Sequence, residues 1–154
     1  MATTLTSADL TVTIKETITL HGYDQGSQNT LTIGSISEVF KRLVTCPASQ
    51  TTTVATFATN VYDSVGAIDT QNAKYIRITN LDDTNPIELA IVGAATLYQV
   101  VLRKGESHVL GTPDDLMLAE ADTSPSFGTM ADIASIQANP GSDSVDLEVF
   151  VASA

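Results

Sequence analysis

The chain has one cysteine, no tryptophan and no long hydrophobic run, and each absence excludes a class of protein. The single thiol, Cys46, cannot form an intrachain disulfide, and its position before Pro47 predicts a small buried apolar residue. Because no run approaches the roughly 18 apolar residues of a membrane-spanning helix, we expect no such helix. Residues 1–6 lack the basic and apolar regions of a signal peptide, so we expect synthesis in a cytosol.

Basic residues are also scarce: seven lysines and arginines stand against eighteen acids, for a net charge of −11. The imbalance lies in residues 82–154, which hold twelve acids and two bases, whereas residues 1–81 have a net charge of −1. A nucleic-acid-binding surface needs clustered bases to displace counterions, and an anionic membrane surface attracts bases for the same reason. The charge therefore argues against both partners and predicts a solvated, self-repelling surface.

The common catalytic and metal-binding motifs are missing. His21 lies in a glycine-rich turn and His108 begins a short apolar run, with no cysteine or second histidine at ligand spacing, so we expect no zinc site. We interpret both as surface or hydrogen-bonding residues. Residues 34–37 do not match a Gly-x-Ser-x-Gly elbow, and residues 93–95 lack the Gly-Lys of a phosphate-binding loop. The sequence therefore predicts no catalytic, cofactor-binding or metal-binding residue, and no cofactor.

Two pairs of adjacent carboxylates, Asp82-Asp83 and Asp114-Asp115, are more typical of solvated turns than of a glycosidase site, whose carboxylates flank a cleft. Oxygen ligands of the kind that calcium prefers are present at Asp82-Asp83 with Asn85, and at Asp143 with its neighbouring hydroxyls. A calcium-binding module therefore stays open as an alternative.

Aromatic residues are few, with four tyrosines and four phenylalanines. We expect Tyr75 and Tyr98 to be packing residues and Tyr23 to be the exposed ring. Such a count argues against tight stacking on sugars but leaves weak glycan binding as another alternative.

What the chain does contain is alternation of apolar and polar residues. In residues 10–20 the even positions are apolar except Glu16 and the odd positions are threonine or lysine, which predicts a strand with one buried face. Runs rich in β-branched residues, separated by Asn, Asp, Pro and Gly, predict further strands. These runs are 30–33, 36–45, 50–58, 75–80, 87–91, 97–102, 108–110, 133–138 and 145–151.

Three segments are less regular. Residues 36–45 also show apolar residues at helical spacing, but Val, Phe and Thr favour a strand. Residues 113–118 could form one helical turn, with acids near its positive end. We expect residues 63–71 to be a loop that Val65 and Ile68 anchor in the core.

About nine strands at roughly ten-residue spacing predict an all-β fold, namely an antiparallel, jelly-roll-like β-sandwich in a single domain. We assign residues 10–154 to this domain. Residues 1–9 are interpreted either as an N-terminal arm that docks on a neighbour or as a frayed end.

Five segments together resemble small virion structural proteins of tailed bacteriophages, some of them from marine phages. They are residues 36–44, 75–80, 87–91, 97–102 with the following turn at Gly105, and 145–151. The resemblance implies a non-enzymatic protein that packs into symmetric assemblies with itself and with other virion proteins, and it carries over no functional residue.

With the acidic charge, the resemblance predicts a homo-oligomeric virion protein, made in the host cytoplasm, on the exterior of a phage particle. Head decoration or cement is the leading expectation. The alternatives are a tail- or fibre-associated virion protein and a β-sandwich module that binds a host surface glycan or calcium.

Overall fold

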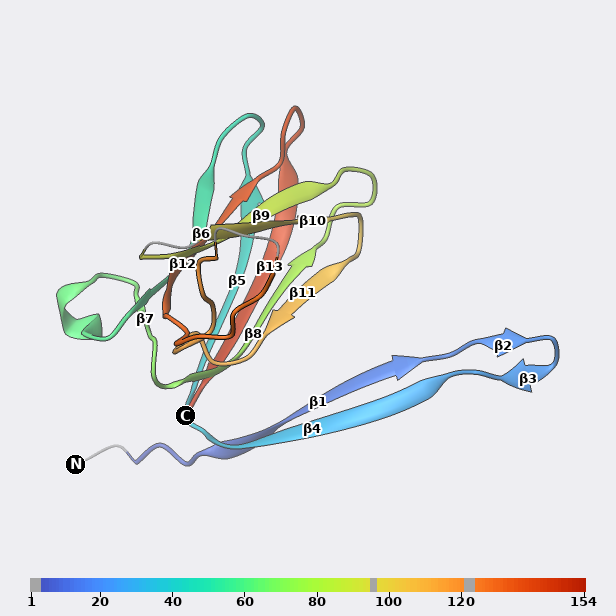
Figure 1. Cartoon of the computed structure of the whole chain (residues 1–154), viewed down its shortest axis with the longest axis horizontal. Helices are drawn as coiled ribbons and strands as arrows, with labels where there is room; N and C mark the ends of the chain where they lie inside the picture. Colours follow the sequence, from blue (N-terminus) through green and yellow to red (C-terminus); the bar gives the residue numbers. More distant parts are fainter. Residues whose placement is uncertain (1–3, 95–96, 121–123) are drawn as a thin grey trace.

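The computed structural model describes residues 4–94, 97–120 and 124–154. These residues form a sandwich of two β-sheets and a two-stranded arm that projects from it (Figure 1). Besides strands, the described part of the chain has one 3-10 turn, η1 (Val61–Asp63), and it contains no helix long and apolar enough to span a membrane. The all-β prediction is confirmed. Predictions that concern residues 1–3, 95–96 and 121–123 lie outside the described residues.

The sandwich consists of a four-stranded sheet in the order β11-β8-β13-β5 and a five-stranded sheet in the order β10-β9-β12-β6-β7. All neighbouring strands are antiparallel except β6 and β7, which are parallel. The strands are β5 (Glu38–Cys46), β6 (Thr52–Ala58), β7 (Ile68–Asp69), β8 (Ala73–Asn80), β9 (Ile87–Gly93), β10 (Leu97–Leu102), β11 (Ser107–Leu110), β12 (Ile133–Asn139) and β13 (Val145–Ser153).

The connectivity is that of a jelly roll. The first strand of the sandwich, β5, pairs with the last, β13, and β6 pairs with the last but one, β12. Inside these pairs, β8 lies between β13 and β11, while β9 lies between β12 and β10. Eight strands thus alternate between two sheets as in a jelly roll built from two Greek keys, which confirms the predicted architecture.

The core lies between the two sheets and is built from the inward face of each strand. On β13 the four inward residues, Val145, Leu147, Val149 and Val151, are fully buried, as the alternation predicts. A hydrogen bond joins the two sheets beside this core: the hydroxyl of Tyr98 on β10 is 3.1 Å from Nε2 of His108 on β11. The other buried apolar residues of this core are Val44, Cys46, Val54, Ala55, Phe57, Ile68, Ala73, Ile76, Ile78, Ile87, Leu89, Ile91, Leu102, Met117, Ile133, Ile136 and Ala138.

Two of the irregular segments differ from their predictions. Residues 113–118 form no helical turn, because the backbone of Met117 pairs with Ala131 in an extended bridge and Asp115 adopts a positive φ of 48°. Val65 is fully exposed, beside the turn η1, so Ile68 alone of the two expected anchors is buried. Residues 38–46 form strand β5, which settles the helix alternative in favour of the predicted strand.

The arm consists of residues 8–36. Its long strands are β1 (Ala8–Glu16) and β4 (Ser27–Ile36), and β2 (Thr19–Leu20) pairs with β3 (Tyr23–Asp24) at its tip. The sandwich had been expected to start at residue 10, but its two sheets begin with β5 at Glu38. Residues 10–20 find their hydrogen-bond partners in residues 23–33, and so they need no neighbour in the sandwich.

Candidate assembly surface

The arm is amphipathic along its length. The register that pairs Leu10 with Ile33 also pairs Leu20 with Tyr23 at the tip. Because directly opposed residues of a hairpin project from the same side, one face of the arm collects its apolar residues and the other its threonines and Lys15. We call the first the apolar face of the arm. It carries Leu10, Val12, Ile14, Ile18, Leu20, Tyr23, Leu31 and Ile33, with the polar residues Glu16, Ser27 and Asn29 among them.

His21 and Gly22 close the arm in a two-residue turn. Both have positive φ angles, 51° and 81°, which is the geometry of a type I′ turn. Such turns match the right-handed twist of the two strands and fix their register. The glycine-rich turn expected at His21 is therefore two residues long, and it lies at the far end of the arm.

The inner half of the apolar face packs on the body. Leu10, Val12 and Ile33 contact a cluster on the outer face of the four-stranded sheet, the side that faces away from the core. The rings of Tyr75 and Phe150 in this cluster meet edge to face, with centroids 6.1 Å apart. Ile36 and Ala152 complete the cluster. This contact fixes the direction in which the arm leaves the sandwich.

The outer half of the apolar face has no such cover. Ile14, Ile18, Leu20, Leu31 and Tyr23 are each more than half exposed. The arm diverges from the body (Figure 1), and a groove opens between Val12, Ile14 and Leu31 on one side and Tyr75 and Val109 on the other. A two-stranded hairpin is marginal in water by itself, and an exposed apolar face of this extent is typical of an interaction surface. The outer half is therefore the candidate functional site.

The outer face of the four-stranded sheet also holds exposed apolar residues. Val39 and Leu43 on its edge strand β5 are each more than half exposed, and Lys41 lies between them on the same side. Lys41 Nζ is 3.3 Å from Oε2 of Glu148, and Arg77 donates a hydrogen bond to Oε1 of the same carboxylate. The hydrogen bond from Arg77, supported by Lys41, holds the pKa of Glu148 below its usual range.

The ion pairs of Glu148 make the free energy of unfolding depend on pH. The native state binds fewer protons at Glu148 than the unfolded state, so the ion pairs stabilise it fully above the unfolded pKa of about 4.3 and less as pH falls through the lower folded pKa. Urea unfolding should show the wild type more stable than Glu148→Gln at pH 7. We expect this difference to shrink between about pH 5 and pH 3. An equal difference at pH 7 and pH 3 would contradict the assignment.

The residues singled out from the sequence lie apart from one another. Cys46 is fully buried in the core, as predicted, and burial raises the pKa of its thiol. His108 is a hydrogen-bonding residue, as interpreted, and burial lowers its pKa. Tyr75 and Tyr98 pack as expected, but Tyr62 is even more exposed than Tyr23 because it lies in the turn η1.

The Asp82-Asp83 pair lies in a turn, as expected. Asp82 Oδ1 accepts the backbone N–H groups of Thr84 and Asn85 at 2.8 and 2.6 Å, and these bonds lower its pKa. The N–H of Asp115 donates to the carboxylate of Asp132 at 2.9 Å. In the described part of the chain, no three His, Cys, Asp or Glu side chains are grouped so as to hold a metal ion.

Comparisons with known proteins identify no family. No family model matches the chain, and no curated protein matches it. One solved structure is similar: a chain from work entitled "Bacillus endospore appendages form a novel family of disulfide-linked pili". The match has a TM-score of 0.39 and 9% identity, and it covers 75% of this chain and 87% of the other.

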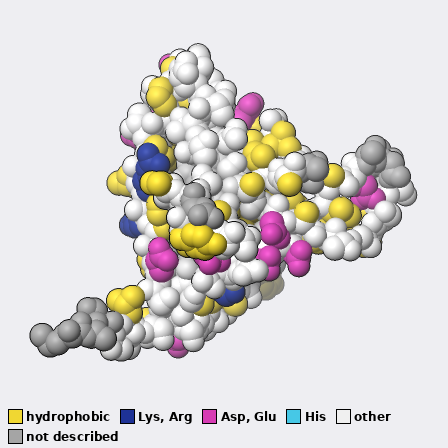
Figure 2. All heavy atoms as spheres, turned by 90° about the vertical axis from the view of Figure 1, so that its left-hand side faces the viewer, with side chains coloured by type: hydrophobic (Ala, Val, Ile, Leu, Met, Phe, Trp, Pro, Cys, Tyr) yellow, Lys and Arg dark blue, Asp and Glu magenta, His cyan; other side chains and the backbone are white. Residues whose placement is uncertain are grey.

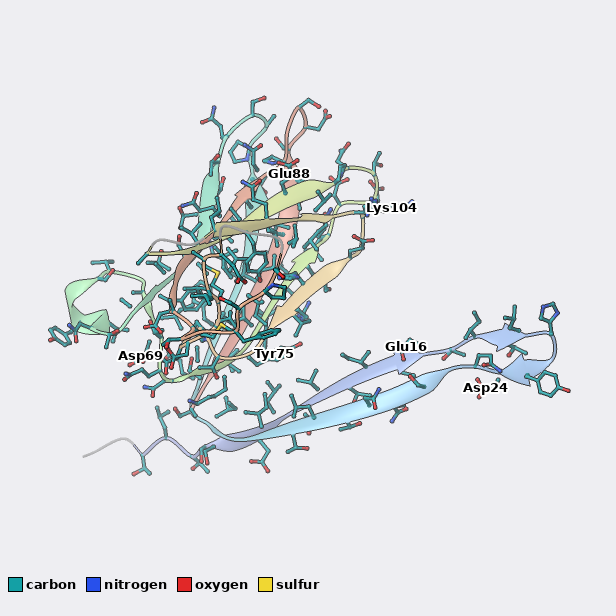
Figure 3. All side chains as sticks on the ribbon, in the orientation of Figure 1. Glu16, Asp24, Asp69, Tyr75, Glu88 and Lys104 are labelled. Atoms are coloured by element: carbon teal, nitrogen blue, oxygen red, sulfur yellow. The ribbon has the colours of Figure 1, made fainter. Side chains whose placement is uncertain are left out.

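The outer half of the arm is the feature that sequence reasoning missed. The sequence predicts Ile14, Ile18 and Leu20 on a buried face, because a strand that covers a core and a strand that contacts a partner show the same alternation. One signal was present. A strand buried in a core rarely tolerates an unpaired charge, and Glu16 interrupts the apolar face near its middle. Figure 3 shows Glu16 on the projecting part of the arm, away from Tyr75 in the body.

Proposed function

We propose that this protein is a non-enzymatic structural subunit that assembles with copies of itself, and that its arm is the contact element. The observation that carries the proposal is the apolar face of the arm, which packs on the body over its inner half and is exposed over its outer half. Covering Ile14, Ile18, Leu20 and Leu31 in an assembly would gain roughly 25 cal/mol for each Å² of apolar surface removed from water.

The chemistry of the remaining surface supports a structural role. Of the two histidines, His108 bonds to Tyr98 between the sheets and His21 lies at the tip of the arm, so neither is paired with a nucleophile within the described residues. The jelly roll is the scaffold, and the arm extends beyond it to contact a neighbouring copy.

We further propose that the assembly lies on the exterior of a phage particle, as a head decoration or cement layer. The acidic charge supports this position, because a net charge of −11 disfavours contact with packaged nucleic acid. Acidic side chains are dispersed over the face shown in Figure 2, as suits a solvated outer surface. Electron microscopy of phage particles labelled with an antibody against the chain would test this proposal. Label on the head supports it, whereas label on the tail, or none, contradicts it.

Sedimentation velocity tests self-association. The variant Ile14→Thr/Ile18→Thr/Leu31→Thr places β-branched residues at all three positions but removes three of the five exposed apolar side chains of the outer half. We expect wild type to sediment as multiples of 16.2 kDa at rising concentration, and the variant to remain a monomer to at least tenfold higher concentration, because about 1.4 kcal/mol corresponds to tenfold in affinity.

The matched control is Thr11→Ser/Thr13→Ser/Thr30→Ser, which makes three substitutions on the opposite face of the same strands. It should assemble as wild type does. Wild type that is monomeric at every concentration would overturn the proposal, and so would a triple threonine variant that assembles normally.

A further inference from the structure

Two strands of this chain carry complementary triplets. On the apolar face of the arm, Ile14 and Ile18 flank Glu16; on the outer face of the four-stranded sheet, Val39 and Leu43 flank Lys41. We infer that the outer half of one copy's arm docks on strand β5 of a second copy, with Glu16 facing Lys41. This inference rests on the proposed self-association and names its two surfaces.

The first argument is continuity with a contact that the structure shows. The inner half of the arm packs on part of the outer face of its own four-stranded sheet, around Tyr75, Phe150 and Ala152. The remaining part of that sheet face, at Val39 and Leu43, is exposed, and so is the outer half of the arm. Each copy thus exposes the outer half of its arm and the β5 part of its sheet face. We expect the contact between copies to resemble the contact that the inner half of the arm makes within one copy.

The second argument is charge. Around Lys41 the sheet face carries two cations, Lys41 and Arg77, and one anion, Glu148, so this ion cluster has a net charge of +1 in a protein of net charge −11. The next acid along the face, Asp146, accepts a hydrogen bond from Thr45. Glu16 is an exposed anion in the middle of an apolar face, and it accepts a hydrogen bond from the hydroxyl of Ser27 at 2.7 Å. Docking would place the carboxylate of Glu16 beside Lys41, where its single negative charge offsets the +1 charge of the ion cluster.

The contact joins the arm of one copy to the body of another, so either two copies exchange arms about a two-fold axis or successive copies join head to tail. Head-to-tail contacts close into a ring or continue as a filament, according to the rotation between copies. A symmetric stacking of two arms is the competing arrangement. It would bring two copies of Glu16 to one contact and would leave Lys41 without a role.

Charge reversal distinguishes the two arrangements. Glu16→Lys sets lysine against Lys41, and Lys41→Glu sets two glutamates together, so each variant alone should dissociate at least tenfold more readily than wild type. In an equimolar mixture, each arm finds an opposite charge on the other variant's sheet. The mixture should therefore assemble, and the double variant Glu16→Lys/Lys41→Glu should assemble alone.

Matched controls carry the same change of charge elsewhere on the exposed body: Asp83→Lys for Glu16→Lys, and Lys104→Glu for Lys41→Glu. Both should assemble as wild type does in sedimentation velocity. Recovery in the mixture also shows that the single variants are folded. If wild type assembles but Lys41→Glu has no effect, or the mixture fails to recover, this docking is wrong while self-association stands. If wild type never assembles, the proposed function itself fails.

Discussion

Replacing Leu147 by alanine is expected to lower the free energy of unfolding by about 3 kcal/mol. Leu147 has 0% exposure and lies on β13, the strand that pairs with both β5 and β8 in the four-stranded sheet. The lost side chain leaves a cavity that two packed sheets cannot close, so the transfer and cavity costs add. For a domain of this size, the melting temperature should fall by roughly 6–12 °C.

Leu43→Ala is the matched control, because Leu43 lies on the neighbouring strand with 67% exposure. Its unfolding free energy should stay within about 0.5 kcal/mol of wild type. Both measurements belong in the triple threonine background, where assembly does not add to stability. A Leu147→Ala variant that melts with the control would mean that β13 does not lie at the centre of the sandwich.

Asn80→Ala is expected to be nearly as damaging, at roughly 3 kcal/mol. Asn80 is fully buried at the end of β8, and its side chain holds two loops together. Its Nδ2 donates to the carbonyls of Asn85 and Leu102 at 2.9 and 3.1 Å, and its Oδ1 accepts the N–H of Asp82 at 2.9 Å. Alanine removes all three bonds, of which the one to the Leu102 carbonyl is buried and the other two are part-buried. A buried backbone group without its partner costs about 1–3 kcal/mol.

Urea unfolding would check this effect against Asn29→Ala, which alters an exposed asparagine of the arm. That control should leave the sandwich unchanged within about 0.5 kcal/mol. If Asn80→Ala unfolds at the same urea concentration as the control, the hydrogen bonds of Asn80 do not stabilise the body.

The sandwich could be predicted from the sequence because each of its strands covers one core. In β13, Val145, Leu147, Val149 and Val151 alternate with Asp146, Glu148 and Phe150, and the structure buries the first set. The wrong predictions concern segments whose sequence pattern does not match their conformation in the structure. The run Pro113-Asp114-Asp115 suits a helix start, yet the bridge between Met117 and Ala131 holds the chain extended. Long-range backbone pairing of this kind leaves no local signal.

The candidate site was predicted in part. The arm that the sequence suggests is residues 1–9, whereas the arm of the structure is residues 8–36. The alternation over residues 10–20 does show that one face is apolar. It does not show what covers that face, because a strand has the same period on a core and at an interface. The proposed contact of Glu16 with Lys41 requires the fold, since the outward side of strand β5 becomes known only from the pairing with β13.

The central claim is that the arm joins copies of this chain. Hydrogen exchange of the wild-type protein, followed by mass spectrometry at low and high concentration, tests it most directly. Amides in residues 8–36 and 38–46 should exchange more slowly at high concentration, while those in β9 and β12 exchange at unchanged rates. Association without any slowing in the arm would contradict the account.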